Sequence, residues 1–145
     1  MTLTRHTPLR RRTRLRRFNP ERRAARRIVD FGALGEFVRT FGCAVEGCGR
    51  RSECAHVKSR GAGGHAWLVD QAGRYVGNLV PLCHGHHSLQ HTIGLHDFER
   101  GHRFRLRLGI ESTTTVLLSN LAALIGSLAI GAGIDPSTNA RREVS

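Results

Sequence analysis

The stretch NLVPLCHGHHSLQH, residues 78–91, holds one Cys, four His and one Asn within fourteen residues. Cys83 and His86 have the x2 spacing with which two side chains grip one Zn²⁺ from a tight turn. His87 and His91 are four residues apart, so on a helix their side chains point the same way and can share a second cation. A polar, His-rich loop is the plain alternative. Two adjacent ligand pairs favour a metal site, around which we expect the rest of the chain to fold.

The other half of the first metal site lies upstream, in GCAVEGCGRRSECAH at residues 42–56. Cys43 and Cys48 are five apart, with glycines at the turn, so both thiolates can face one ion. We therefore predict a knuckle-like turn followed by a short strand, with a structural zinc ion held by Cys43, Cys48, Cys83 and His86. The remaining cysteine, Cys54, is expected to be a small buried filler.

The charge of the chain is concentrated at one end. The 145 residues suit one domain with a modest core, and the formal net charge is +12. Residues 1–27 hold eleven Arg against the single acid Glu21, so they carry +10 and the other 118 residues are nearly neutral. A basic arm on a neutral body indicates attraction to a polyanion, nucleic acid first. The alternative is a solvated tail that binds nothing specific.

The cysteines also indicate a compartment. No apolar run of a secretory signal precedes Phe18, and the four cysteines are mixed with nine His. This pattern favours metal binding in a reducing compartment over disulfides, so we expect a cytoplasmic protein.

Five segments follow from the composition. Residues 1–19 have too few apolar groups to fold alone and are expected to be a disordered Arg-rich arm. Asn19 and Pro20 are helix-start signals, and Ala25, Ile28 and Val29 are candidates for the inner face of the helix that follows. The predicted segments are the arm 1–19, a helical lead-in 20–41, the metal-binding core 42–108, a packing helix 109–134 and a polar tail 135–145.

Residues 116–134, VLLSNLAALIGSLAIGAGI, carry no charge and approach the length that spans a bilayer. Its larger apolar residues fall on one helical stripe, with the small residues largely off it. This stripe comprises Leu117, Leu121, Leu124, Ile125 and Leu128. We predict a helix packed in the core, with a membrane span as the alternative.

In order, the pattern Cys…Cys…His…Asn…Cys…His-His resembles the HNH endonucleases, whose catalytic unit is a ββα-metal fold. The run AHVKSRGAGG…NLVPLCHGHHSLQHTIGLHDFE is similar to the phage-encoded branch that includes recombinase-dependent nucleases. The likeness covers residues 42–100 well and the arm loosely; His56 matches the first His, Asn78 the Asn and His87 the last His. The fold expected is α+β: a small ββα-metal (HNH) core with a structural zinc knuckle, flanking helices and a disordered basic N-terminal arm.

This resemblance implies a metal-dependent DNA endonuclease. His56 would act as the general base. A divalent cation, Mg²⁺ or Mn²⁺, held by His87 and His91 would screen the scissile phosphate and the departing 3′ oxygen. Asn78 would fix the loop and so orient His56. The expected partners are DNA and, as a further candidate, a recombinase filament, with no small-molecule cofactor. The predicted DNA-binding residues are Arg10, Arg11, Arg12, Arg14, Arg16, Arg17, Lys58 and Arg60.

One position departs from the family pattern. Many HNH enzymes place an Asp or His immediately before the base as a metal ligand, and here that residue is Ala55. A carboxylate from elsewhere must complete the site, and Asp70 is the candidate because it falls between His56 and Asn78. Should the third ligand be missing, the chain would be a non-catalytic zinc-knuckle protein that binds DNA or assists recombination.

Overall fold

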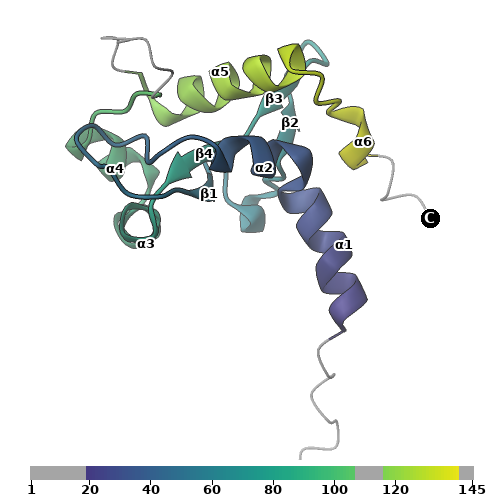
Figure 1. Ribbon diagram of the computed structural model, residues 1–145, viewed down its shortest axis with the longest axis horizontal. Coiled ribbons are helices and arrows are strands. Elements are labelled where there is room, and N and C mark those ends of the chain that lie inside the picture. Colours follow the sequence, from purple (N-terminus) through teal and green to yellow (C-terminus); the bar gives the residue numbers. More distant parts are fainter. Residues whose placement is uncertain (1–18, 107–115, 141–145) are drawn as a thin grey trace, which may run out of the picture.

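The computed structural model describes residues 19–106 and 116–140, and it confirms the α+β class expected from the sequence. The elements are α1 (Pro20–Asp30), α2 (Gly32–Arg39), β1 (Glu53–His56), the 3-10 turn η1 (Arg60–Ala62), β2 (Trp67–Val69), β3 (Tyr75–Gly77), β4 (Leu79–Leu82), α3 (His84–Ile93), α4 (Leu95–Gly101), α5 (Leu118–Gly131) and α6 (Ser137–Ala140). Along the chain, α1 and α2 come first, the short strands β1 to β4 follow, and α3 to α6 come after the strands (Figure 1).

The strands form two antiparallel pairs. β1 pairs with β4 so that Glu53 lies opposite Leu82 and His56 opposite Leu79. β2 pairs with β3, and both belong to the segment that connects β1 to β4. From β4 the chain passes through Cys83 into α3, which contacts both β1 and β4. Two strands and a helix therefore place the end of β1 beside the His-rich stretch.

Helices α2 and α5 cover the strands. α2 contacts β1 and β4, and α5 contacts β3, β4 and α2 (Figure 1). α2 buries Leu34 and Val38 against these neighbours. The core therefore consists of apolar side chains from helices that are far apart in the sequence and that pack against the same short strands.

The buried face of α5 differs from the predicted one. Leu117, Leu124 and Leu128 are 53%, 46% and 36% exposed, whereas Leu121 and Ile125 are buried as predicted. The rest of the buried face is Leu118, Ala122, Gly126 and Ala129.

The reason is a close approach of two backbones. A Cβ atom placed on Gly126 would lie 2.6 Å from the backbone nitrogen of Gly77 in β3, and one on Gly77 would lie 2.5 Å from the Ala122 oxygen. Only small residues allow this contact, so the alanines and glycine turn inward and several leucines turn outward. Within residues 19–106 and 116–140, no helix is both long enough and apolar enough to span a membrane.

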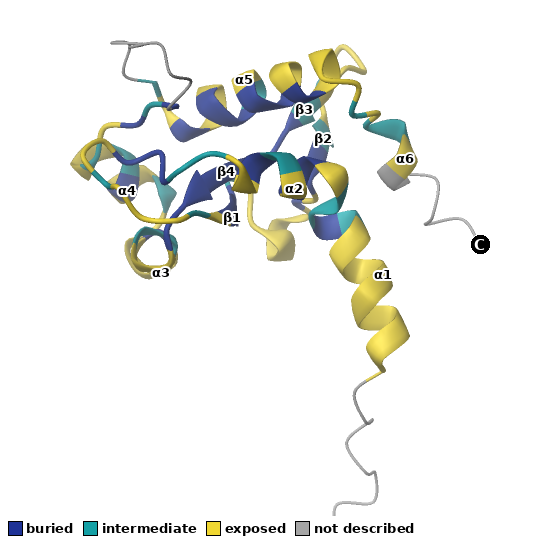
Figure 2. Ribbon diagram, viewed as in Figure 1, coloured by how far each residue is buried: buried dark blue, intermediate teal, exposed yellow. Residues whose placement is uncertain are grey.

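Helix α1 begins where the sequence predicts, because the Asn19 side chain accepts a hydrogen bond from the Arg22 backbone N–H at 3.1 Å. Its predicted inner face is wrong, however. Ala25 and Ile28 are exposed, and burial begins only at the last turn, at Val29 and Asp30 (Figure 2). The helix leads away from the body (Figure 1), so its middle has no core to pack against.

The segment after α4 returns to the metal-binding knuckle. Phe104 forms a β-bridge with Val45, and Phe104 and Leu106 are buried while Arg105 pairs with Glu46. This matches the alternation of arginine and apolar residues in the sequence. The predicted arm arginines, Arg10, Arg11, Arg12, Arg14, Arg16 and Arg17, lie outside the described residues.

Candidate functional site

The four predicted zinc ligands come together in space. Cys43 and Cys48 lie in the loop before β1, Cys83 immediately precedes α3, and His86 stands in its first turn. The Nδ1 atom of His86 is 3.3 Å from the Sγ atoms of both Cys43 and Cys83, and the Sγ atoms of Cys48 and Cys83 are 3.9 Å apart. All four ligand atoms lie within 4.8 Å of one another.

These distances fit four ligands arranged tetrahedrally around one metal ion. With metal–sulfur bonds of about 2.3 Å and metal–nitrogen bonds of about 2.0 Å, neighbouring ligand atoms stand about 3.5 to 3.8 Å apart. The cluster could therefore hold a metal ion such as zinc. In the part of the chain that the structure describes, no other three or more His, Cys, Asp or Glu side chains gather this closely.

Burial sets the protonation of the metal-free cluster. It raises the pKa of the Cys43 thiol to about 11 and lowers the pKa of His86, so His86 is neutral and has a lone pair to offer. The pKa of Cys48 is lowered, mainly by a hydrogen bond from the Arg50 backbone. A bound dication deprotonates a coordinating thiol outright. The fourth cysteine, Cys54, is buried apart from the cluster and donates to the Gly35 oxygen at 3.1 Å, as a filler would.

His56 is buried at the end of β1 with its ring in a defined orientation. Its Nε2 atom is 3.0 Å from the backbone oxygen of Asp30. A carbonyl only accepts, so Nε2 carries the proton and the neutral ring keeps its lone pair on Nδ1. Burial lowers the pKa of His56, which favours this neutral form. Among the described residues, Nδ1 has no hydrogen-bond partner, so its lone pair is available.

Asn78 fastens the loop that follows His56. Its side-chain oxygen accepts from the Lys58 N–H at 2.8 Å, and its amide donates to the oxygens of Lys58 at 3.0 Å and His65 at 2.8 Å. The loop folds tightly at this point, because a Cβ on Gly64 would lie 1.9 Å from the Lys58 oxygen. One buried amide thus holds both ends of the glycine-rich loop.

A second cluster surrounds His87 on the outer side of α3. The Nε2 atoms of His87 and His91 are 3.0 Å apart, as their i,i+4 spacing predicts. Glu53 at the start of β1 reaches the same place, with Oε2 at 3.3 Å from Nδ1 of His87 and Oε1 at 3.2 Å from Nδ1 of His84. Glu53 and His91 meet opposite edges of the His87 ring, so these groups do not converge on one point as the zinc ligands do.

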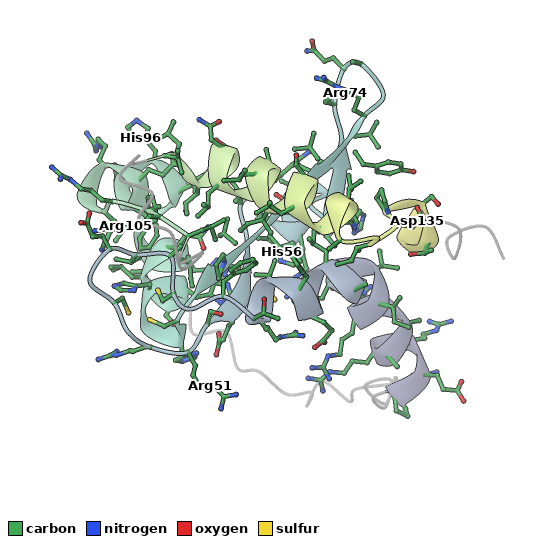
Figure 3. All side chains as sticks on the ribbon, turned by 45° about the horizontal axis from the view of Figure 1, so that its top comes forward. Arg51, His56, Arg74, His96, Arg105 and Asp135 are labelled. Carbon is green, nitrogen blue, oxygen red and sulfur yellow. The ribbon has the colours of Figure 1, made fainter. Side chains whose placement is uncertain are left out.

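Asp70 is not part of this cluster, contrary to the prediction. It lies in the turn between β2 and β3, where its Oδ1 accepts from the N–H groups of Ala72 and Arg74 at 2.9 Å. Its Oδ2 accepts from Nε of Arg74, also at 2.9 Å. Figure 3 shows Arg74 at the far end of this hairpin, well away from His56. The carboxylate is hydrogen-bonded within its own turn, so it is not placed to share an ion with the histidines of α3.

The carboxylate near His87 is Glu53, which the sequence prediction missed. Strand side chains alternate between faces, so Glu53 projects on the same face as Ala55, the position at which many HNH enzymes carry a ligand. That alternation is the signal that could have found it. Two further contacts were also missed: Asp30 holds the His56 ring, and Nε2 of Gln90 donates to the His56 oxygen at 3.2 Å.

The two predicted DNA-binding residues of the loop, Lys58 and Arg60, are both exposed. The Nη1 atom of Arg60 is 3.0 Å from Oδ2 of Asp30, so Arg60 is fixed beside His56.

With this geometry established, the chain was compared with known proteins. No family model, curated protein or solved structure matches it. The function must therefore be argued from the residues themselves.

Proposed function

We propose that this chain is a metal-dependent DNA endonuclease of the HNH type. The observation that carries the proposal is the combination, on two strands and a helix, of a buried neutral His56, a loop held by Asn78 and a half-buried His87. The neighbouring Cys₃His cluster ties the ends of the same unit together. These residue types, in these relative places, correspond to the parts of a phosphodiester hydrolase.

His56 is the proposed general base. The backbone oxygen of Asp30 accepts a hydrogen bond from Nε2–H, so Nδ1 is the nitrogen that would take a proton from the attacking water. Gln90 holds the backbone of His56, and Asn78 holds the loop behind it.

The second ion of the proposal belongs at His87, with Glu53 in place of the predicted Asp70 and with His91 as neighbour. The Glu53 carboxylate is the ligand type that suits Mg²⁺ or Mn²⁺, whereas imidazoles also accept other divalent ions. When bound, such an ion supplies positive charge to the scissile phosphate and to the leaving 3′ oxygen.

One observation favours a second candidate function. Glu53, His87 and His91 do not point to a common centre, and Ala55 offers no ligand. A non-catalytic zinc-knuckle protein that binds DNA, or that assists a recombinase filament, needs only the Cys₃His cluster and basic groups. In that case His56 has no chemical task.

Plasmid nicking separates the two functions. Supercoiled DNA is incubated with Mn²⁺ or Mg²⁺ and the native chain, His56→Ala or His87→Ala, each with and without a recombinase-coated single strand. We expect His56→Ala to lose about 10²- to 10⁴-fold in nicking rate, the usual contribution of a general base, and His87→Ala to lose nicking through weaker binding of the second ion. Zinc content should be unchanged in both variants. His96→Ala is the matched control, because His96 is an exposed histidine of α4 that pairs with Asp97. Native protein that binds DNA but nicks under none of these conditions would establish the binding protein instead.

A further inference from the structure

A cavity of about 490 Å³ opens next to His56, where the end of α1 meets the glycine-rich loop. Its lining is small and mostly charged. The residues are Arg26, Asp30, Arg60, Gly61 and His65. None of them belongs to the zinc cluster or to the cluster around His87.

The charges of the cavity are arranged around one buried carboxylate. The side chain of Asp30 is 7% exposed, whereas that of Arg60 is 60% exposed. Oδ2 of Asp30 accepts from one Nη1 of Arg60 at 3.0 Å, and Oδ1 lies 3.8 Å from Nδ1 of His65. A guanidinium has five N–H donors, so this single bond orients Arg60 and leaves most of its fork available.

The cavity is therefore a positive site, not a neutral one. Arg26 and Arg60 contribute two positive charges against the one negative charge of Asp30, so the net charge is +1 even with His65 neutral. A planar guanidinium fork held in place by a carboxylate suits the oxygens of a phosphate group.

Helix α1 continues the positive charge outward from the cavity. Arg22 and Arg26 are four residues apart and share one side of the helix, and Arg23 and Arg27 are adjacent to that side. The helix is exposed along this length and leads away from the body (Figures 1 and 2). Its arginines form an exposed row that ends in the cavity, at Asp30.

Asp30 connects this cavity to the proposed base. Its carboxylate orients Arg60 within the cavity, and its backbone oxygen accepts from Nε2 of His56 at 3.0 Å. A phosphate bound by Arg60 would consequently lie one residue, Asp30, away from His56.

We propose that the cavity binds a backbone phosphate of the DNA strand, with Arg60 and Arg26 as donors, and that the arginine row of α1 guides the neighbouring phosphates of that strand. The inference rests on the proposed function in one respect, namely that the bound strand is DNA. It adds to that function the path by which DNA reaches His56.

The salt dependence of DNA binding tests this inference. Affinity for a short duplex is measured over a series of salt concentrations, without added Mg²⁺ or Mn²⁺, for the native chain, Arg26→Ala and Arg60→Gln. Each phosphate contact that is lost should reduce the slope of log K against log salt by about 0.9. In the described part of the chain, Asp30 pairs with Arg60 and not with Arg26, so Arg26→Ala leaves the Asp30–Arg60 pair intact and remains informative if Arg60→Gln does not fold.

Arg74→Ala is the matched control. Like Arg60, Arg74 is paired with an aspartate, so the substitution removes the same single positive charge. Arg74 stands on a hairpin whose tip lies far from His56 (Figure 3). We expect the native slope for Arg74→Ala and a smaller slope for Arg26→Ala. Equal slopes for Arg26→Ala and Arg74→Ala would overturn the proposal. Because the assay contains no cleavage step, a reduced slope supports the phosphate site even where the nicking assay rejects the nuclease.

Discussion

His86 and His87 are neighbours on α3, yet their side chains belong to two clusters of opposite character. His86 points to three cysteines in a compact, largely buried group whose ligand atoms all lie within 4.8 Å of one another. His87 points outward to Glu53 and His91, which approach it from opposite sides. Structural metal sites in proteins are closed by their own ligands, whereas catalytic sites keep a position open for water or substrate. The first cluster has the form of a closed, structural site, and the chemical task of the second belongs to the proposed function.

The largest expected effect lies at the closed cluster. Structural zinc contributes about 10 to 16 kcal/mol of binding free energy in small domains, which is comparable with a whole domain's stability of about 5 to 15 kcal/mol. Cys43→Ser should therefore lose zinc and unfold, as monitored by metal analysis and circular dichroism. Cys54→Ala is the control, because Cys54 is a buried cysteine outside the cluster. It should keep its zinc and lose only about 1 kcal/mol. A Cys43→Ser protein that keeps its native structure without zinc would show that the first cluster does not stabilise the fold.

An intermediate effect is expected at the open cluster. Glu53→Gln keeps the size of the side chain and removes its charge, so the ion at His87 should bind less well and nicking should fall about 10- to 100-fold in subsaturating Mn²⁺. Asp70→Asn should leave nicking unchanged, because the Asp70 carboxylate bonds to Ala72 and Arg74 in its own turn. Zinc content should be native in both variants. The reverse result, with Asp70→Asn impaired and Glu53→Gln active, would show that the second ion binds at the β2–β3 hairpin instead.

The smallest effect is a shift of the pH profile. Burial lowers the pKa of His56 from its ordinary 6.5, and the proposed base acts in its neutral form. As pH falls through 6.5, an exposed histidine would begin to lose activity, whereas His56 should stay neutral until the pH reaches its lower folded value. The acid limb of nicking at saturating metal should accordingly lie below 6.5.

Stability should follow the same group. Between the folded pKa of His56 and 6.5 the unfolded chain binds more protons, so stability is full above 6.5 and declines as pH falls. Urea titrations of the native chain and of His56→Gln isolate this contribution, since the remaining groups are common to both. An acid limb above 6.5, or equal pH dependence in the two proteins, would show that His56 is not the buried base described.

Short-range spacing predicted much of the candidate site. The x2 interval between Cys83 and His86 and the glycine turn between Cys43 and Cys48 predicted the cluster that the structure assembles. The i,i+4 interval predicted that His87 and His91 meet. Such patterns succeed because a turn or a helix fixes the relative positions of side chains a few residues apart, whatever the rest of the fold does.

Predictions that depended on distant segments failed more often. Asp70 lies between His56 and Asn78 in the sequence, but the hairpin of β2 and β3 carries it away from α3 (Figure 3). Glu53 enters the second cluster only because the pairing of β1 with β4 places the start of β1 beside α3. Neither fact can be read from the residues near Asp70 or Glu53.

The sequence by itself determined the local features: the Cys₃His set, the His87–His91 pair, the N-cap of α1 at Asn19 and the basic character of the N-terminal region. Only the tertiary structure decided which carboxylate stands beside His87, which carbonyl orients His56 and which face of α5 is buried. The physical reason is that local geometry is set by backbone dihedrals over a few residues, whereas these choices depend on strand register and on the close contact of Gly77 with Gly126 across the core.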